Sequence, residues 1–174
     1  MKGRSMLSVE SHRRIRHAME IRHHSFVDKS FVALLRKYRI ALVVADTAGK
    51  WPYLEEVTSD FMYLRLHGEE ELYASGYTEV ALNRGAKRIR EWSEGKEPKD
   101  VKHISNVSPS QRASRDVYCY FDNDVKVRAP FDAKRLIEKL GLADGLVPFR
   151  WSGDPQPVKP RPSATCRVKR KQKR

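Results

Sequence analysis

The sequence predicts an α/β fold with a parallel sheet built from repeated strand and helix units. Short apolar runs of strand length recur along the chain, a turn follows each of them, and in three cases an amphipathic helical pattern follows the turn. Strands that alternate with helices form parallel sheets, and right-handed crossovers place the helices on the outer face. The expected strands cover residues 17–23, 41–46, 61–68 and 116–124.

The first two units differ in the segments after their strands. After the strand at 17–23, Asp28 is suited to cap a helix. The apolar residues of that helix recur at helical spacing and are Phe31, Leu34, Leu35 and Tyr38. After the strand at 41–46, the connection 47–60 (TAGKWPYLEEVTSD) has room only for a short helix.

The last two units each contain a full helix. Thr78 precedes the helix that follows the strand at 61–68, and Gly95 ends it. Its apolar face consists of Leu82, Ala86, Ile89 and Trp92. Residues 96–115 are expected to form a long surface loop. The final helix starts at Pro130, where a first turn tolerates proline, and stops at Gly141. Leu136, Ile137 and Leu140 form its apolar stripe.

Composition indicates a soluble protein. The 174 residues are 40% hydrophobic and 33% charged, which is typical of a globular domain. No apolar run approaches the roughly 20 residues needed to cross a bilayer, and the N-terminal sequence lacks the hydrophobic core of a secretory signal. We therefore expect a cytoplasmic protein without a membrane partner. Cys119 and Cys166 form no CxxC motif, which argues against a disulfide or metal framework.

The net charge of +13 is concentrated at the two ends of the chain. Residues 154–174 carry eight Lys or Arg and one acidic residue, and residues 1–16 carry five and one. The chain therefore divides into a folded domain, 1–146, and a basic, Pro-rich tail, 147–174, which we expect to be disordered. Such a tail can bind polyanions weakly through phosphate contacts, or it can serve as a solvated terminus.

Alternation along the strands predicts two faces of the sheet. The residues expected to face the helices are Met19, Ile21, Val43, Ala45, Met62, Leu64, Leu66, Val117, Cys119 and Phe121. The opposite face then presents Glu20, Arg22, Asp46, Tyr63, Arg65, His67, Tyr118, Tyr120 and Asp122, together with apolar Leu42 and Val44. These polar groups lie toward the C-terminal ends of the strands, where a (β/α) barrel builds its ligand site.

Several chemistries are compatible with this set. Glu20 and Asp46 are candidates for a general acid and base. The set Glu20, Asp46, His67 and Asp122 is instead a candidate for a divalent metal site, although no particular metal is indicated. Arg22 and Arg65 are suited to clamp a carboxylate or phosphate. The polar residues can also simply cap the sheet or form structural salt bridges, and spacing does not choose among these roles.

Four motifs resemble the uncharacterised YecE-like family, domain of unknown function seventy-two. They are ExRH at 20–23, ADTAGKWP at 45–52, YLRLHG at 63–68 and YFDND at 120–124, and the similarity spans about residues 2–142. The resemblance implies a TIM-type barrel and no agreed activity. The pocket residues that it implies are Glu20, Arg22, Asp46, Tyr63, Arg65, His67, Tyr120, Asp122 and Asn123.

The resemblance covers four of the eight units of such a barrel. These units are similar to the C-terminal half of the family domain, so we expect a half barrel whose Met1 is an internal start, or a gene that is truncated or mis-called. The open sheet edges are then expected to bind the missing N-terminal half or a second copy of the chain. The leading functional hypothesis is a pocket for a small polar or anionic ligand, with hydrolysis or isomerisation in the full-length form. The alternatives are nucleic-acid association through the tail and an inactive fragment.

Overall fold

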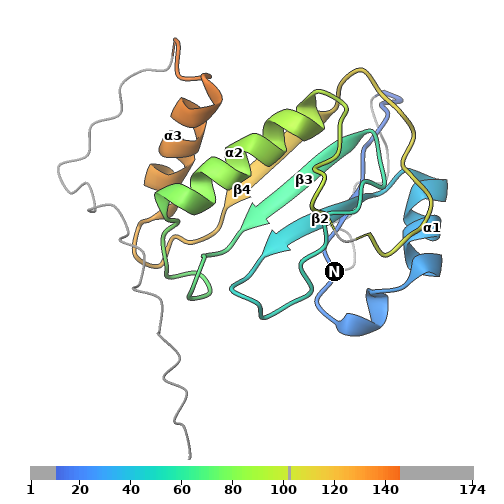
Figure 1. Cartoon of the computed structure of the whole chain (residues 1–174), viewed down its shortest axis with the longest axis horizontal. Helices are drawn as coiled ribbons and strands as arrows, with labels where there is room; N and C mark the ends of the chain where they lie inside the picture. Colours follow the sequence, from blue (N-terminus) through green and yellow to red (C-terminus); the bar gives the residue numbers. More distant parts are fainter. Residues whose placement is uncertain (1–10, 102, 146–174) are drawn as a thin grey trace, which may run out of the picture.

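The computed structural model describes residues 11–101 and 103–145. It contains a four-stranded parallel sheet in the order β1-β2-β3-β4, flanked by helices (Figure 1). The strands are β1 (Ala18–Met19), β2 (Ala41–Asp46), β3 (Phe61–Leu66) and β4 (Asp116–Phe121). The helices are η1 (His24–Phe26), α1 (Lys29–Tyr38), α2 (Glu79–Ser93) and α3 (Ala129–Leu140). The predicted α/β fold with a parallel sheet is confirmed.

The helix ends lie where the capping residues predicted them. The Asp28 side chain accepts hydrogen bonds from the backbone N–H groups of Ser30 and Phe31. Thr78 accepts one from Ala81 at 3.2 Å, and Gly141 ends α3 in the left-handed conformation, with a φ of 73°. The helices begin and end at these positions because such contacts satisfy the first and last backbone groups of each helix.

The first strand is much shorter than predicted. Only Ala18 and Met19 pair with β2, whereas the expected strand ran over 17–23. Its alternation persists beyond the hydrogen bonds, since Ile21 is buried and Arg22 is exposed. An edge strand needs hydrogen bonds on one side only, so the chain can leave the ladder early while keeping its apolar side inward. The third and fourth strands likewise end two and three residues sooner than expected.

The expected orientation of β2 is wrong. Val43 is paired with Tyr63 and lines the open face of the sheet, whereas Leu42 and Val44 are 1% exposed and pack toward the helices. The run ALVVA is apolar at every position, so it contains no alternation that could reveal its orientation. The prediction depended on Asp46 alone. Because β2 is buried on both faces, a polar residue at its end does not determine which way the strand is turned.

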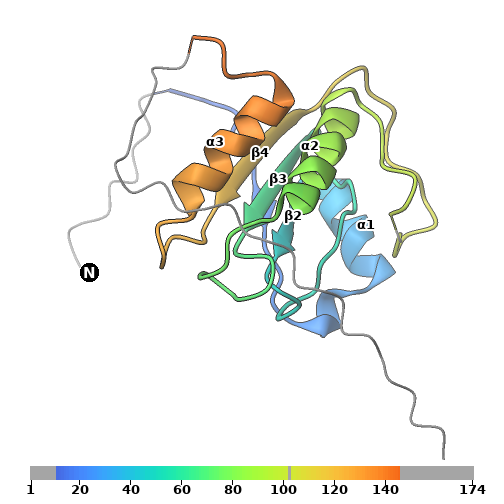
Figure 2. The same cartoon turned by 60° about the vertical axis from the view of Figure 1, so that its left-hand side comes forward.

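Two apolar clusters hold the helices to the sheet. α2 and α3 cover β3 and β4, while α1 lies at the other end of the sheet, beside β1 and β2 (Figures 1 and 2). In α1 the buried residues are Val32 and Leu35, whereas Leu34 and Tyr38, expected in its apolar stripe, are 51% and 61% exposed. Only these two residues of the helix are buried, so its buried stripe is narrower than the sequence pattern predicts.

The connection 47–60 contains no helix, and the expected loop 96–115 has no regular secondary structure over its described residues. The two segments are joined by the buried carboxylate of Glu56, which accepts hydrogen bonds from the backbone N–H groups of Ile104 and Ser105. Within the described ranges, no helix has both the length and the apolar character that a membrane crossing requires. The basic tail, 147–174, lies outside the described residues.

Candidate functional site

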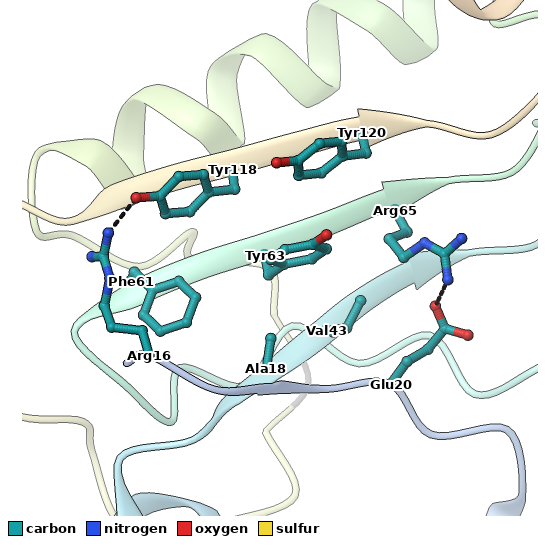
Figure 3. Close-up of a pocket in the computed structure, with 9 residues that line it drawn as sticks. All are labelled: Arg16, Ala18, Glu20, Val43, Phe61, Tyr63, Arg65, Tyr118 and Tyr120. Atoms are coloured by element: carbon teal, nitrogen blue, oxygen red, sulfur yellow. Dashed lines mark hydrogen bonds and ion pairs between the residues drawn. The ribbon is translucent and has the colours of Figure 1, made fainter. Parts of the chain in front are cut away.

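The face of the sheet opposite the helices contains a pocket of about 560 Å³. Side chains from all four strands and from the segment before β1 surround it (Figure 3). The lining residues are Arg16, Ala18, Glu20, Val43, Phe61, Tyr63, Arg65, Tyr118 and Tyr120. Their positions on β3 and β4 follow the predicted alternation, because residues two apart along a strand point to the same side.

Aromatic rings form one wall of this pocket. Tyr63 stacks against Tyr120 with ring centroids 5.2 Å apart and against Tyr118 at 6.5 Å. Phe61 meets Tyr118 edge to face at 5.9 Å. Offset stacking and edge contacts of this kind are favourable arrangements for aromatic pairs. The wall therefore presents a flat apolar surface next to the charged groups at both ends of the pocket.

An arginine outside the predicted set of site residues closes one end of the pocket. Arg16 forms an ion pair with Asp116, with 2.6 Å between Nη1 and Oδ2, and donates a hydrogen bond to the hydroxyl of Tyr118. Its guanidinium also lies over the ring of Phe61, 4.8 Å from the centroid. Strand alternation predicts this position, because residues 16, 18 and 20 share one side of the first strand and its extension.

Arg65 organises the other end of the pocket. Its Nη1 lies 2.8 Å from Oε2 of Glu20, and its Nη2 lies 2.7 Å from Oδ2 of Asp122. Arg22 holds the other oxygen of Glu20, with 2.8 Å between Nε and Oε1. Partial burial opposes ionisation of Glu20, but the two arginines outweigh it and lower the pKa of this carboxyl. Glu20, Arg22, Arg65 and Asp122 are thus brought together as predicted, although both predicted anion-binding arginines already contact carboxylates.

His67 lies at the centre of this charged cluster and is fully buried. Its Nε2 is 3.8 Å from Oε2 of Glu20 and its Nδ1 is 3.7 Å from Oδ2 of Asp122. Among the described residues, neither ring nitrogen has a hydrogen-bond partner. Burial and the nearby charge of Arg65 lower the pKa of His67, despite the two carboxylates. The lowered pKa favours the neutral imidazole, which has one donor and one acceptor nitrogen.

Two aromatic side chains and Arg22 surround the imidazole. Trp51, from the connection after β2, meets His67 edge to face with centroids 5.7 Å apart, and Tyr73 does so at 5.2 Å. Arg22 lies over the Trp51 ring, 4.3 Å from its centroid. These contacts exclude solvent from His67. Tyr73 was not selected from the sequence, since it lies in an irregular loop where no periodicity relates it to the strands.

Asp46 is not part of the cluster. Its carboxyl group forms a hydrogen bond with Tyr77, whose hydroxyl also accepts one from the backbone N–H of Gly68 at 3.1 Å. Burial raises the pKa of Asp46. The predicted acid and base pair of Glu20 and Asp46 is therefore not assembled, because β2 has the opposite orientation to the one expected and places Asp46 on the helix side of the sheet.

Asn123, expected to bind ligand, is fully buried beneath α3. Its Nδ2 donates hydrogen bonds to the carbonyl of Ser75 at 2.9 Å and to Asp132 at 2.8 Å. Asp132 also accepts a hydrogen bond from the backbone N–H of Tyr77 at 3.1 Å. These contacts connect the loop after β3 to the start of α3, so Asn123 has a structural role and does not line the pocket. Asp132 was not predicted, because an acidic residue in a first helical turn needs no further explanation.

The metal hypothesis gains no support from this geometry. Within the part of the chain that the structure describes, no three His, Cys, Asp or Glu residues are arranged to hold a metal ion. The carboxylates of Glu20 and Asp122 are directed at Arg65 instead. The guanidinium occupies the position between them that a cation would need.

A family model described as a protein of unknown function, DUF72, matches residues 4–159. The chain belongs to the DUF72 family. Two solved DUF72 structures share its fold, and comparison with curated proteins gives no match. The protein from Thermotoga maritima is 24% identical, with a TM-score of 0.57 over 73% of this chain and 46% of its own. The protein from Enterococcus faecalis is 17% identical, with a TM-score of 0.58 over 79% and 52%.

The DUF72 chain therefore spans about half the length of these two solved relatives. At this level of identity the likeness concerns the fold alone. The family description names no activity, so the chemistry of the pocket has to be argued from its own residues.

Proposed function

We propose that the four strands of this chain are half of an eight-stranded, YecE-like TIM barrel, and that the charged cluster is its ligand site. Two observations support the proposal: the charged residues lie at or just after the C-terminal ends of the strands, and two solved DUF72 proteins have about twice the length of the matched region. The ligand is a small polar or anionic molecule, and the reaction is a hydrolysis or an isomerisation.

The single observation that carries this function is the buried, unpartnered imidazole of His67. A buried polar group without a partner costs about 1–3 kcal/mol, which a purely structural residue would avoid. Groups kept at such a cost occur where a ligand supplies the missing hydrogen bond. A ligand hydroxyl or carbonyl that reached His67 would meet a neutral ring able to accept or donate one proton.

Each neighbour has a role in this proposal. Glu20 and Asp122 flank the two ring nitrogens, so they stabilise the imidazolium that forms when His67 takes a proton. Arg65 positions both carboxylates. Arg22 is the first contact for an anion, because its side chain is 56% exposed and only its Nε is engaged with Glu20. Tyr63 and Tyr120 contact the apolar part of the ligand.

A ligand can reach His67 only if the side chains that cover it, Arg22 and Trp51, move. Trp51 meets the imidazole edge to face, and Arg22 lies over the Trp51 ring. Trp51 belongs to a connection without helix or strand. An anion that drew Arg22 away from the Trp51 ring would open the path to the imidazole. Binding and exposure of the proton-transfer group are thereby coupled in the proposed mechanism.

The test is a thermal-shift screen of the purified chain with inorganic phosphate, citrate and a panel of sugar phosphates. At least one probe is expected to raise the melting temperature of the wild type, because a ligand that binds the folded state stabilises it. Arg22→Gln and His67→Gln should each abolish that shift. Arg84→Gln, which removes an exposed arginine outside the cluster, should retain it. The proposal fails if no probe stabilises the protein, or if Arg84→Gln behaves like the two site variants.

A further inference from the structure

Both outer strands of the sheet have an open edge. Over the described residues, β1 pairs only with β2 and β4 only with β3. Each open edge presents unpaired backbone donors and acceptors, which is a template for another strand. Large apolar side chains lie near both edges: Ile15 and Met19 are 72% and 41% exposed, and Tyr118 and Tyr120 are 36% and 49% exposed. A protein surface of this kind needs a covering partner.

The two edges have opposite charges at the same end of the sheet. Arg16 lies two residues before β1, and Asp116 is the first residue of β4. The Arg16 side chain crosses over Phe61 to β4, where it forms the ion pair with Asp116 at 2.6 Å; Figure 3 shows it directed at Tyr118 of the same strand. Arg14, four residues before β1, is 66% exposed and forms a second ion pair, with Asp60 at 3.4 Å. A basic first edge and an acidic start of the last edge are complementary.

We propose that the partner is a second copy of this chain, with β4 of each copy adding to β1 of the other. The strand order then continues as β4 to β1 of the partner, in the parallel direction that the sheet already has, and a twofold axis repeats the contact. Eight tilted parallel strands close a barrel whose interior side chains can fill. The inference rests on the half barrel of the proposed function, because the closed ring also completes the ligand pocket.

Several features favour a second copy over an unrelated partner. One chain spans 46% and 52% of two solved relatives, so two copies supply about the same length of chain as one relative. The same contact places α3 of one copy beside α1 of the other, where Leu34 and Tyr38 are exposed. The opposing effect is the charge of +13 on each chain, which salt screens over about 8 Å at physiological ionic strength.

The first measurement is the mass of the full-length chain in solution by light scattering, in 150 mM salt across the micromolar range. The expected mass is twice the 20.2 kDa of one chain. A monodisperse monomer with cooperative unfolding overturns the proposal. This outcome does not decide the proposed function, because the thermal-shift screen tests ligand binding through Arg22 and His67 and does not depend on the mass of the protein in solution.

Charge reversal then tests where the edges meet. Arg16→Glu and Asp116→Arg should each weaken dimerisation at least about tenfold, because either change opposes like charges at both contacts of the twofold dimer. An equimolar mixture should recover dimers, since one contact then has the native pair and the other the reversed pair. Glu94→Lys, whose partner Lys96 is two residues away, should dimerise like the wild type.

The mixing experiment distinguishes pairing between chains from pairing within one chain. Each single variant loses its internal Arg16–Asp116 pair, and mixing cannot restore an internal contact. The proposal is contradicted if the mixture stays monomeric, or if both single variants dimerise as tightly as the wild type. Both side chains are at least one-third exposed, so the variants are expected to fold, and the circular dichroism of each monomer checks this.

Discussion

Replacing His67 by leucine should stabilise the protein while removing its ligand response. The imidazole is fully buried, and neither ring nitrogen has a hydrogen-bond partner among the described residues. An apolar side chain of similar size avoids the cost of removing those nitrogens from water. This is the pattern of a functional group that is held at the expense of stability.

The size of the effect follows from the contacts of the ring. Removing the unsatisfied polar group should raise the free energy of unfolding by about 1–3 kcal/mol. Losing the edge contacts with Trp51 and Tyr73 costs about 0.5–1.5 kcal/mol. The net expectation for His67→Leu is a gain of about 1 kcal/mol in the free energy of unfolding, or about 2–4 °C in melting temperature for a chain of this size.

Urea denaturation, with the wild type measured in parallel, is the appropriate assay. Asp132→Ala is the contrasting variant, because Asp132 accepts hydrogen bonds from buried Asn123 and from the N–H of Tyr77. It should destabilise the protein by about 2–5 kcal/mol, since it leaves one N–H of the Asn123 amide and the backbone N–H of Tyr77 without an acceptor. A loss of more than about 1 kcal/mol in His67→Leu would show that the imidazole makes stabilising hydrogen bonds, and the interpretation of His67 would be wrong.

Two further outcomes are expected. Folding lowers the pKa of His67 from 6.5, so the unfolded chain binds more protons at this residue than the folded protein does. The wild type should therefore lose stability as the pH falls below about 6.5, and His67→Leu should lose less over the same range. Urea denaturation at several pH values measures both. An equal slope in both proteins would contradict this sign. Gly95→Ala should destabilise by about 2 kcal/mol or more, because Gly95 has a φ of +74° and an added Cβ would lie 1.9 Å from the carbonyl oxygen of Arg112. Gly85→Ala, in α2 with open space around it, is the matched control and should be neutral or stabilising by up to about 1 kcal/mol; similar losses in both variants would refute the steric argument.

Much of the fold could be predicted from local chemistry. Asp28, Thr78 and Gly141 mark helix ends because caps are decided by a few adjacent residues. The orientation of β2 could not be predicted, because its residues are apolar on both sides and only contacts distant in sequence determine which side meets the helices. The shortness of β1 depends equally on pairing with β2.

The candidate site shows the same division. Glu20, Arg65, His67 and Asp122 could be grouped because strand alternation and the common direction of parallel strands bring their side chains to one place. Asp46 was grouped with them in error, since its strand has no informative alternation. Tyr73 could not be found, because it reaches the imidazole from an irregular loop whose course depends on tertiary contacts.

The proposal that His67 is a neutral, buried group awaiting a ligand is tested most directly by nitrogen NMR of the imidazole during a pH titration. We predict a pKa below 6.5 in the free protein. We also expect both ring-nitrogen signals to move when the stabilising anion from the thermal-shift screen is added, and Arg22→Gln to prevent the movement. A pKa at or above 6.5, or ring-nitrogen signals that do not move when the anion is added, would contradict the proposal.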